Sequence, residues 1–158
     1  MRRVLRIAPP VLVLAVAWLA SCGDSPTEVP DPEDLTYAPE LGVDFTKMTR
    51  TSSGLWMQDV EVGSGMQAAV GDSLDVLYEA WLPSGLRFDA ATDPDDPAIV
   101  RVGVGDLIDG WDEGIPGMRV GGLRRLVIPP HLGYGSRANG PIPGNSTLVF
   151  DVWLQSIR

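Results

Sequence analysis

Alternation of apolar and polar side chains is the clearest pattern in the sequence, and it is confined to the chain beyond residue 50. Apolar residues occupy every second position over residues 74–82 and again over residues 148–154. A period of two is typical of a strand with one buried face. Shorter runs of the same kind, separated by turns rich in glycine and proline, cover residues 55–62, 86–89, 99–102 and 123–128. The sequence therefore predicts a sheet of short antiparallel strands joined by hairpins.

Only residues 109–115 favour a helix. Asp109 is placed to cap the first turn, acidic residues follow it, and Pro116 ends the segment. One short helix cannot form a second layer unless the sheet curls around it. The predicted fold class is therefore α+β, with a curved antiparallel β-sheet wrapped around one short α-helix. Trp111 is expected to point from this helix into the sheet.

The first 22 residues have the features of a targeting segment. Three arginines precede the apolar stretch 7–20, which at about 14 residues is too short to span a bilayer as a helix. The stretch ends in Leu19-Ala20-Ser21-Cys22, which resembles the bacterial lipobox. This resemblance implies cleavage before Cys22, lipidation of Cys22, and anchoring to the inner or the outer membrane of a bacterial cell envelope. The alternative is an ordinary signal peptide in which the cysteine is incidental.

Residues 23–50 differ from both neighbouring regions in composition. They are rich in proline, aspartate and glutamate, and no apolar period runs through them. We interpret them as an acidic, Pro-rich linker that is disordered or partly extended. Such a linker would hold a folded domain, residues 51–158, away from the membrane.

Length and charge exclude several classes of function. A chain of 158 residues is expected to form one domain, and 12 basic against 21 acidic residues give a net charge of -9. This charge repels phosphate backbones and excludes nucleic acid as a partner. One cysteine and one histidine exclude a disulfide framework and a Cys/His zinc site. The acidic run 93–97 lacks the spacing of a calcium loop, so neither a metal nor a cofactor is predicted.

The remaining chemistry lies in aromatic and aliphatic residues that come from several segments. From the pattern alone, a plain hydrophobic core is the more economical explanation. The order and the amino-acid sequence of the segments favour a different explanation, because over residues 51–158 they strongly resemble the FKBP-type peptidyl-prolyl cis-trans isomerases. The resemblance rests on Val76-Leu77-Tyr78, Phe88-Asp89, the stretch 103–115, Met118-Arg119-Val120-Gly121, Ile128-Pro129-Pro130, Gly133-Tyr134-Gly135, Ile142-Pro143 and the stretch 147–152.

The resemblance implies an aromatic pocket that binds proline and accelerates rotation about X-Pro bonds in exported proteins. It assigns catalysis to Tyr78, Asp89, Ile108 and Tyr134, with the Ile108 N–H and the Tyr134 hydroxyl binding substrate carbonyls. It assigns substrate binding to Phe88, Leu107, Trp111, Ile142 and Phe150. Proline-containing polypeptide clients and macrolide inhibitors are the implied partners. A non-catalytic module that holds client chains in the same apolar cleft is the alternative.

Three features depart from the family pattern. Pro94 stands where a basic residue often pairs with the aspartate, and Ala98 replaces a frequent aromatic residue. The loop 136–146 is one residue shorter than in small members of the family. We therefore expect Asp89 to lack its usual ion-pair partner and the affinity for macrolides to differ.

Overall fold

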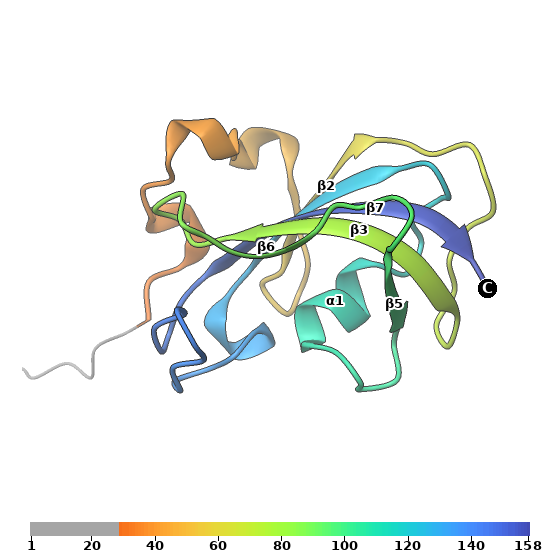
Figure 1. Ribbon diagram of the computed structural model, residues 1–158. Helices are drawn as coiled ribbons and strands as arrows, with labels where there is room; N and C mark the ends of the chain where they lie inside the picture. Colours follow the sequence, from red (N-terminus) through yellow and green to blue (C-terminus); the bar gives the residue numbers. More distant parts are fainter. Residues whose placement is uncertain (1–28) are drawn as a thin grey trace, which may run out of the picture.

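One strongly bent sheet dominates the computed structural model, which describes residues 29–158 (Figure 1). Its seven strands follow the order β1-β2-β6-β7-β3-β4, and β5 pairs with the same edge of β3 as β4 does. All pairings are antiparallel. The strands are β1 Thr49–Arg50, β2 Trp56–Glu61, β3 Ser73–Trp81, β4 Arg87–Ala91, β5 Ala98–Arg101, β6 Leu123–Ile128 and β7 Leu148–Ile157. The predicted strands are confirmed, and β1 is an addition.

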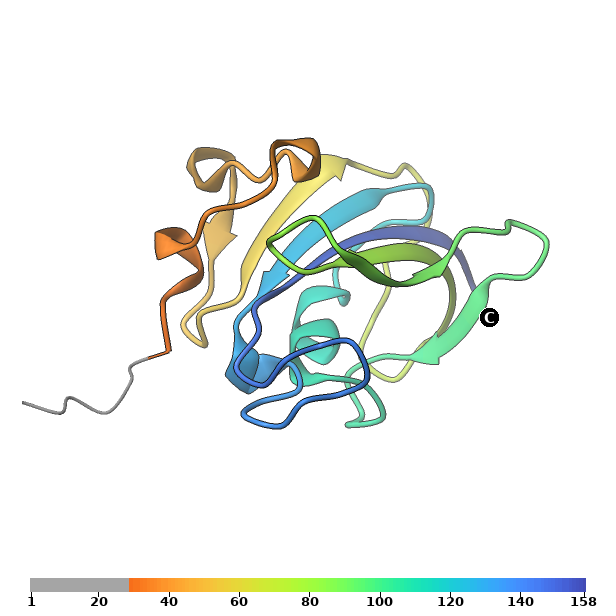
Figure 2. The ribbon, with the colours of Figure 1, turned by 60° about the vertical axis from the view of Figure 1, so that its left-hand side comes forward.

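The helix α1, Asp109–Gly114, lies in the hollow of the curved sheet (Figure 2). This confirms the predicted fold class. The prediction that Asp109 caps the helix is wrong, because Ile108 occupies the cap position and offers no side-chain hydrogen bond. The Asp112 carboxylate instead accepts hydrogen bonds from the backbone N–H groups of Gly103 and Gly105, at 2.8 and 2.6 Å. The loop before the helix is thereby tied to the first turn.

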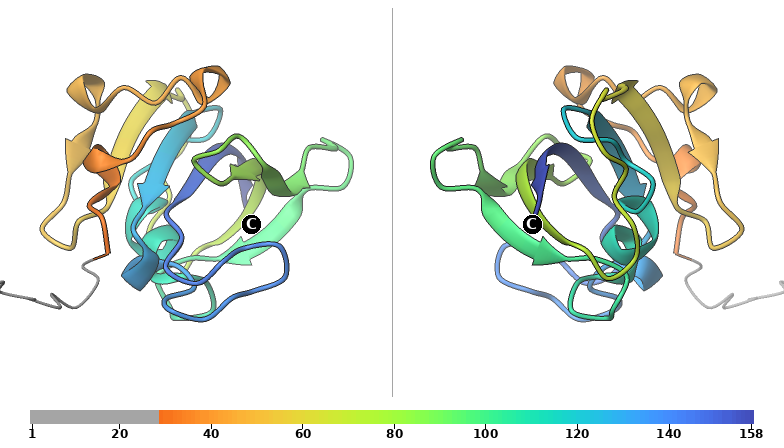
Figure 3. Two further views of the ribbon diagram at one scale, coloured as in Figure 1. Left: turned by 90° about the vertical axis from the view of Figure 1, so that its left-hand side faces the viewer. Right: turned by 90° about the vertical axis from the view of Figure 1, so that its right-hand side faces the viewer.

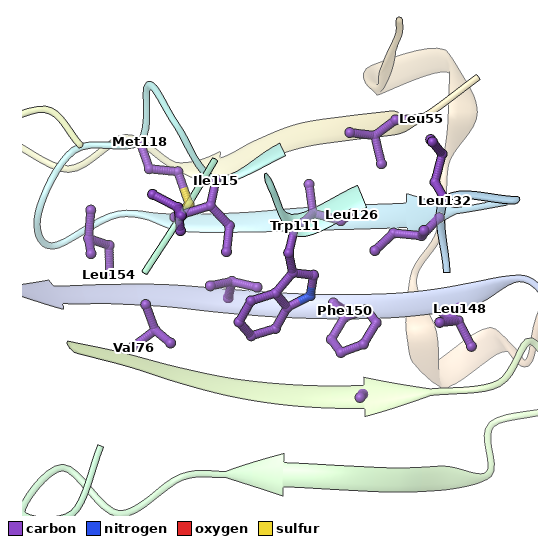
Figure 4. Close-up of a cluster of buried hydrophobic side chains, with 14 of the residues drawn as sticks. Leu55, Val76, Trp111, Ile115, Met118, Leu126, Leu132, Leu148, Phe150 and Leu154 are labelled. Carbon is purple, nitrogen blue, oxygen red and sulfur yellow. The ribbon is translucent and has the colours of Figure 1, made fainter. Parts of the chain in front are cut away.

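Contact between α1 and the sheet is close because two helix positions carry no side chain. A Cβ atom at Gly110 would lie 2.6 Å from Cγ2 of Ile128, and one at Gly114 would lie 2.8 Å from Cδ2 of Leu126. Both distances are shorter than a van der Waals contact allows. The glycines thus let the helix approach β6, and Trp111 points into the main core, as predicted (Figure 4).

A buried arginine joins the end of α1 to the sheet. Arg124 on β6 is only 8% exposed, and its Nε and Nη2 donate to the two carboxylate oxygens of Asp59 at 2.7 and 3.0 Å. Its Nη1 donates to the carbonyl oxygen of Gly114 at 2.8 Å. Bidentate, charge-assisted bonds of this kind restrict geometry as well as adding energy. They hold the C-terminal end of the helix against β6.

The segment before β1 is a cover for the convex face of the sheet, not the extended linker that its composition indicates. It forms the short 3-10 helices η1 Pro32–Asp34, η2 Pro39–Leu41 and η3 Phe45–Lys47. These lie on the side of the sheet opposite α1 (Figure 3). Residues 23–28 of the expected linker, like the leader and Cys22, lie outside the described residues.

Apolar contacts explain why this cover folds without a regular sequence pattern. A second core contains the buried side chains Leu41, Met48, Trp56, Val127 and Val149. The Phe45 ring lies edge-on to the Trp56 ring, with centroids 4.9 Å apart. The convex face is itself apolar at these strand positions, and burying it against the segment offsets the cost of ordering the chain.

Polar contacts add to the same attachment. Arg125 on the convex face makes a bidentate ion pair with Asp151, with both N–O distances at 2.7 Å. Its remaining nitrogen donates to the carbonyl oxygen of Gly42 at 2.9 Å.

Among the residues the structure describes, no helix has the length and apolar character that crossing a bilayer requires.

If residues 29–50 belong to the folded domain, truncating a buried side chain there must weaken the whole fold. We expect Leu41→Ala to lower the free energy of unfolding by about 2–4 kcal/mol, through lost burial and a residual cavity. Denaturant unfolding of the complete chain measures this. The control Glu33→Ala removes an exposed side chain and should change stability by less than about 0.5 kcal/mol. Equal stability of the two variants would restore the linker interpretation.

Candidate active site

An open cavity of about 540 Å³ lies where the start of α1 faces β3, β4, β5 and β7. Its walls also include the loop before α1 and the turn after η4, Pro130–Leu132. The lining residues are Tyr78, Asp89, Ala98, Val100, Asp106, Leu107, Ile108, Asp109, Trp111, Gly133, Tyr134 and Phe150. The cavity therefore draws on segments from most of the chain beyond residue 70.

Aromatic rings form the interior of the cavity. Trp111 is 5% exposed and meets the rings of Tyr78 and Phe150 edge to face, with centroids 5.2 and 5.4 Å apart. Strand alternation places Tyr78 and Phe150 on the concave face, since Phe150 lies opposite Ala80, two residues beyond Tyr78. The Trp111 Nε1 is buried and has no hydrogen-bond partner among the described residues. The rings interlock at their edges and still leave a hollow in front of them.

Asp89 reaches this hollow because of a bulge in β4. Ala80 pairs with Asp89 and Trp81 pairs with Arg87, so Phe88 has no partner across the strand. A bulge re-aims side chains, which brings the consecutive residues Phe88 and Asp89 to the concave side. The hydroxyl of Tyr78 donates to Oδ2 of Asp89 at 2.8 Å. The carboxylate is thereby held beside the aromatic rings.

Burial and a neighbouring negative charge keep the two cavity tyrosines protonated. Burial raises the pKa of Tyr78, and the hydrogen bond to Asp89 and the charge of Asp89 raise it further. Burial also raises the pKa of Tyr134, again with a contribution from the charge of Asp89. Tyr134 is 37% exposed and lines the cavity. Its hydroxyl is therefore an accessible, neutral hydrogen-bond donor.

The backbone of Ile108 offers a second donor. Ile108 precedes the first turn of α1, and its carbonyl oxygen accepts from the N–H groups of Trp111 and Asp112 at 2.9 and 3.2 Å. Its own N–H makes no hydrogen bond within residues 29–158. Because Ile108 also lines the cavity, this N–H can serve a bound carbonyl group.

Most of the site residues expected from the sequence meet in this cavity, and two do not form its wall. The Phe88 ring packs edge-on against the Phe150 ring, with centroids 5.9 Å apart. Ile142 is 4% exposed and belongs to the main core. Neither residue lines the cavity: Ile142 is part of the main core, and Phe88 is partly buried and packs against that core.

Other lining residues escaped the sequence argument. Asp106 and Asp109 flank the expected pair Leu107-Ile108, and this adjacency is the signal that could have found them. Val100 lines the cavity because β5 pairs with β3, which no local pattern indicates.

Within residues 29–158, no group of three or more His, Cys, Asp or Glu side chains is placed to hold a metal ion.

Comparison with known proteins places these features in a family. The family model for FKBP-type peptidyl-prolyl cis-trans isomerases matches residues 64–155. An FK506-binding protein of Neisseria meningitidis serogroup B is 43% identical over 105 residues, which are 66% of this chain and 96% of that protein.

Solved structures agree with the sequence comparison. FkpA from Escherichia coli superimposes with a TM-score of 0.66 and 37% identity, covering 75% of this chain and 55% of FkpA. A peptidyl-prolyl cis-trans isomerase from Pseudomonas syringae pv. tomato has a TM-score of 0.63 and 28% identity, covering 70% of this chain and 80% of that one. Every residue that lines the cavity falls inside the matched range. The chain belongs to the FKBP-type peptidyl-prolyl cis-trans isomerases and is an enzyme of that type.

Proposed function

We propose that this isomerase acts on proline-containing segments of exported polypeptides while it is tethered to a membrane of the bacterial cell envelope. Rotation about an X-Pro bond must cross roughly 18–20 kcal/mol, because amide resonance is lost in the twisted state. Unaided, it takes tens of seconds or longer. The reaction breaks no covalent bond and requires no proton transfer, so binding and electrostatics must supply the catalysis.

The prolyl ring enters the hollow and rests on the Trp111 indole, with Tyr78 and Phe150 at its sides. A planar amide has more charge separation than a twisted one. Removing its water therefore raises the energy of the starting state, by about 1–3 kcal/mol for each polar group left without a partner. The proposal that the cavity binds proline rests on one observation: aromatic rings form its floor, and the backbone N–H of Ile108 at its edge makes no hydrogen bond among the described residues.

Desolvation alone is too weak to account for a useful rate. Bringing a process of tens of seconds into the millisecond range needs about 10⁴-fold acceleration, or roughly 5.5 kcal/mol. Donation from the Ile108 N–H and the Tyr134 hydroxyl to substrate carbonyls supplies part of the remainder. The Asp89 carboxylate, held by Tyr78, adds a fixed negative charge beside the rotating bond.

The same cavity is the proposed binding site for macrolide inhibitors. The relative from Neisseria meningitidis is named as an FK506-binding protein. A macrolide that competes with peptide substrate would occupy the hollow over Trp111. Ala98 lines this cavity, and its small side chain would leave a space that the aromatic residue frequent at this position in the family would fill.

Membrane attachment is proposed from the leader, in which Cys22, the only cysteine of the chain, ends a lipobox-like sequence. Two acyl chains suffice for stable anchoring, since each buried CH₂ contributes about 0.8 kcal/mol. The structure describes the chain from residue 29, and the stretch from Cys22 to Val29 spans at most about 25 Å when fully extended. The enzyme would therefore work close to the membrane surface.

The role of Trp111 can be tested against another tryptophan of the same chain. We expect Trp111→Leu to lower kcat/KM by about tenfold or more, corresponding to about 1.4 kcal/mol of lost transition-state binding. The control Trp153→Leu alters a half-buried tryptophan that does not line the cavity, and should keep the wild-type value. Isomerisation of an X-Pro peptide gives the rates, and circular dichroism confirms folding. Wild-type activity in folded Trp111→Leu would remove the indole from the mechanism.

The pH profile tests the absence of proton transfer. The tyrosine pKa is ordinarily about 10, and the shifts at Tyr78 and Tyr134 are upward, so both hydroxyls keep their protons as the pH rises. We expect kcat/KM to stay within about twofold from about pH 6 to about pH 9. The measurement is peptide isomerisation across that range at constant ionic strength. A descending limb centred below pH 9 would show that an ionising group takes part.

Lipidation can be read directly from the mature N-terminus. We expect mass spectrometry of the membrane-bound protein to find an N-terminal peptide that starts at Cys22 and carries acyl chains. Cys22→Ser should move the protein from the membrane fraction to the soluble fraction or leave the leader uncleaved. An unmodified cysteine, or cleavage at another bond, would contradict the anchor and leave an ordinary signal peptide.

A further inference from the structure

The walls of the proline cavity carry charge of only one sign. Asp89, Asp106 and Asp109 line it, whereas no lysine, arginine or histidine does so. The loop that joins β4 to β5, two strands that contribute lining residues, adds three exposed carboxylates. These are Asp93, Asp95 and Asp96. A substrate in the hollow therefore meets carboxylates at the site itself and on an adjoining loop.

The carboxylates of the lining sit on ordered segments. Asp89 accepts the Tyr78 hydroxyl at 2.8 Å. Asp106 lies in the loop that Asp112 ties to α1 through Gly103 and Gly105. Asp109 is the first residue of α1. Fixed charges interact more strongly with a bound ligand than charges on mobile chains, because less ordering is needed on binding.

Among the described residues, no cationic side chain lies beside Asp106 and Asp109, which we call the carboxylate rim, in the lining of the cavity. Three arginines of the sheet are paired elsewhere: Arg124 with Asp59, Arg125 with Asp151, and Arg87 with Glu79. None of these six residues lines the cavity. Arg101 on β5 donates to the carbonyl oxygen of Gly71 at 3.1 Å, and neither it nor Arg137, in the loop after Tyr134, lines the cavity. The charged residues that line the cavity are therefore all negative, and a negatively lined cleft concentrates cationic ligands.

We propose that the carboxylate rim selects client segments with lysine or arginine next to the proline. Asp106 and Asp109 stand on either side of Leu107-Ile108, so a residue adjoining the carbonyl that binds the Ile108 N–H lies within their reach. This inference rests on the proposed role of Ile108. One opposite charge at about 4 Å across water changes affinity by about fivefold, and salt screens the effect. Anionic neighbours of proline are disfavoured by the same charges.

The test compares peptides that differ only in the residue before proline, as lysine, leucine or glutamate, with a second series that varies the residue after it. In at least one series at low ionic strength, we expect kcat/KM for the lysine peptide to exceed that for the glutamate peptide by about tenfold. The ratio should fall toward about twofold near 1 M salt, where the Debye length is about 3 Å. Both peptide series are measured first with the wild-type chain.

A charge-removing variant identifies the source of the preference. In Asp106→Asn/Asp109→Asn, the lysine-to-glutamate ratio should fall to about one third of the wild-type ratio or less. If this double variant fails to fold, Asp106→Asn alone should lower the ratio by about twofold or more. The control Glu33→Gln/Asp34→Asn removes the same charge from η1, which does not line the cavity, and should keep the wild-type ratio.

Two failures can be told apart. Absence of turnover on the leucine peptides would contradict the isomerase assignment of the cavity. Turnover on leucine peptides with equal rates for lysine and glutamate in both series would overturn the selectivity and leave the isomerase intact. A preference that survives in the folded rim variant would place its origin outside Asp106 and Asp109, and would also overturn the proposal.

Discussion

The cavity depends on how closely one short helix can lie against the concave face of a bent sheet. Gly110 and Gly114 remove the side chains that would hold α1 away from Ile128 and Leu126. Arg124 then ties the end of the helix to β6 through Gly114 and Asp59. With the helix at this distance, the Trp111 indole meets Tyr78 and Phe150 edge to face and leaves a hollow in front of them. A more distant helix would leave the indole without these partners.

The cavity combines an apolar floor with polar groups at its edge, and the two parts have separate tasks. In the proposed mechanism the rings exclude water and accept the prolyl side chain, and the peptide bond before the proline rotates without assistance from an acid or a base. The polar groups are few and held in place: an amide at the helix cap, neutral tyrosine hydroxyls, and carboxylates on ordered segments. Such fixed dipoles and charges need little reorganisation when the amide twists.

The N-terminal segment changes how the domain is delimited. It covers the convex face of the sheet, and the Ala38 N–H donates to the carbonyl oxygen of Pro83 in the turn that leads to β4. The same β4 carries Phe88 and Asp89 of the site. Residues 29–50 therefore belong to the folded domain and are not a linker that precedes it.

Local pattern was sufficient for the strands and for the position of the helix, which depend on neighbours in the chain, although it misplaced the helix cap by one residue. Alternation located the strands, with β6 at the predicted residues, and the resemblance assigned the ring residues that surround the hollow. Three features depended on contacts between distant segments: the cover formed by residues 29–50, the packing of Phe88 and Ile142 with the core instead of in the cavity lining, and the contribution of Val100 through β5. Periodicity reports which face of a strand is apolar. It does not report which other segment covers that face, or which apolar side chain is left facing a hollow. The closing of the sheet around the helix decides both.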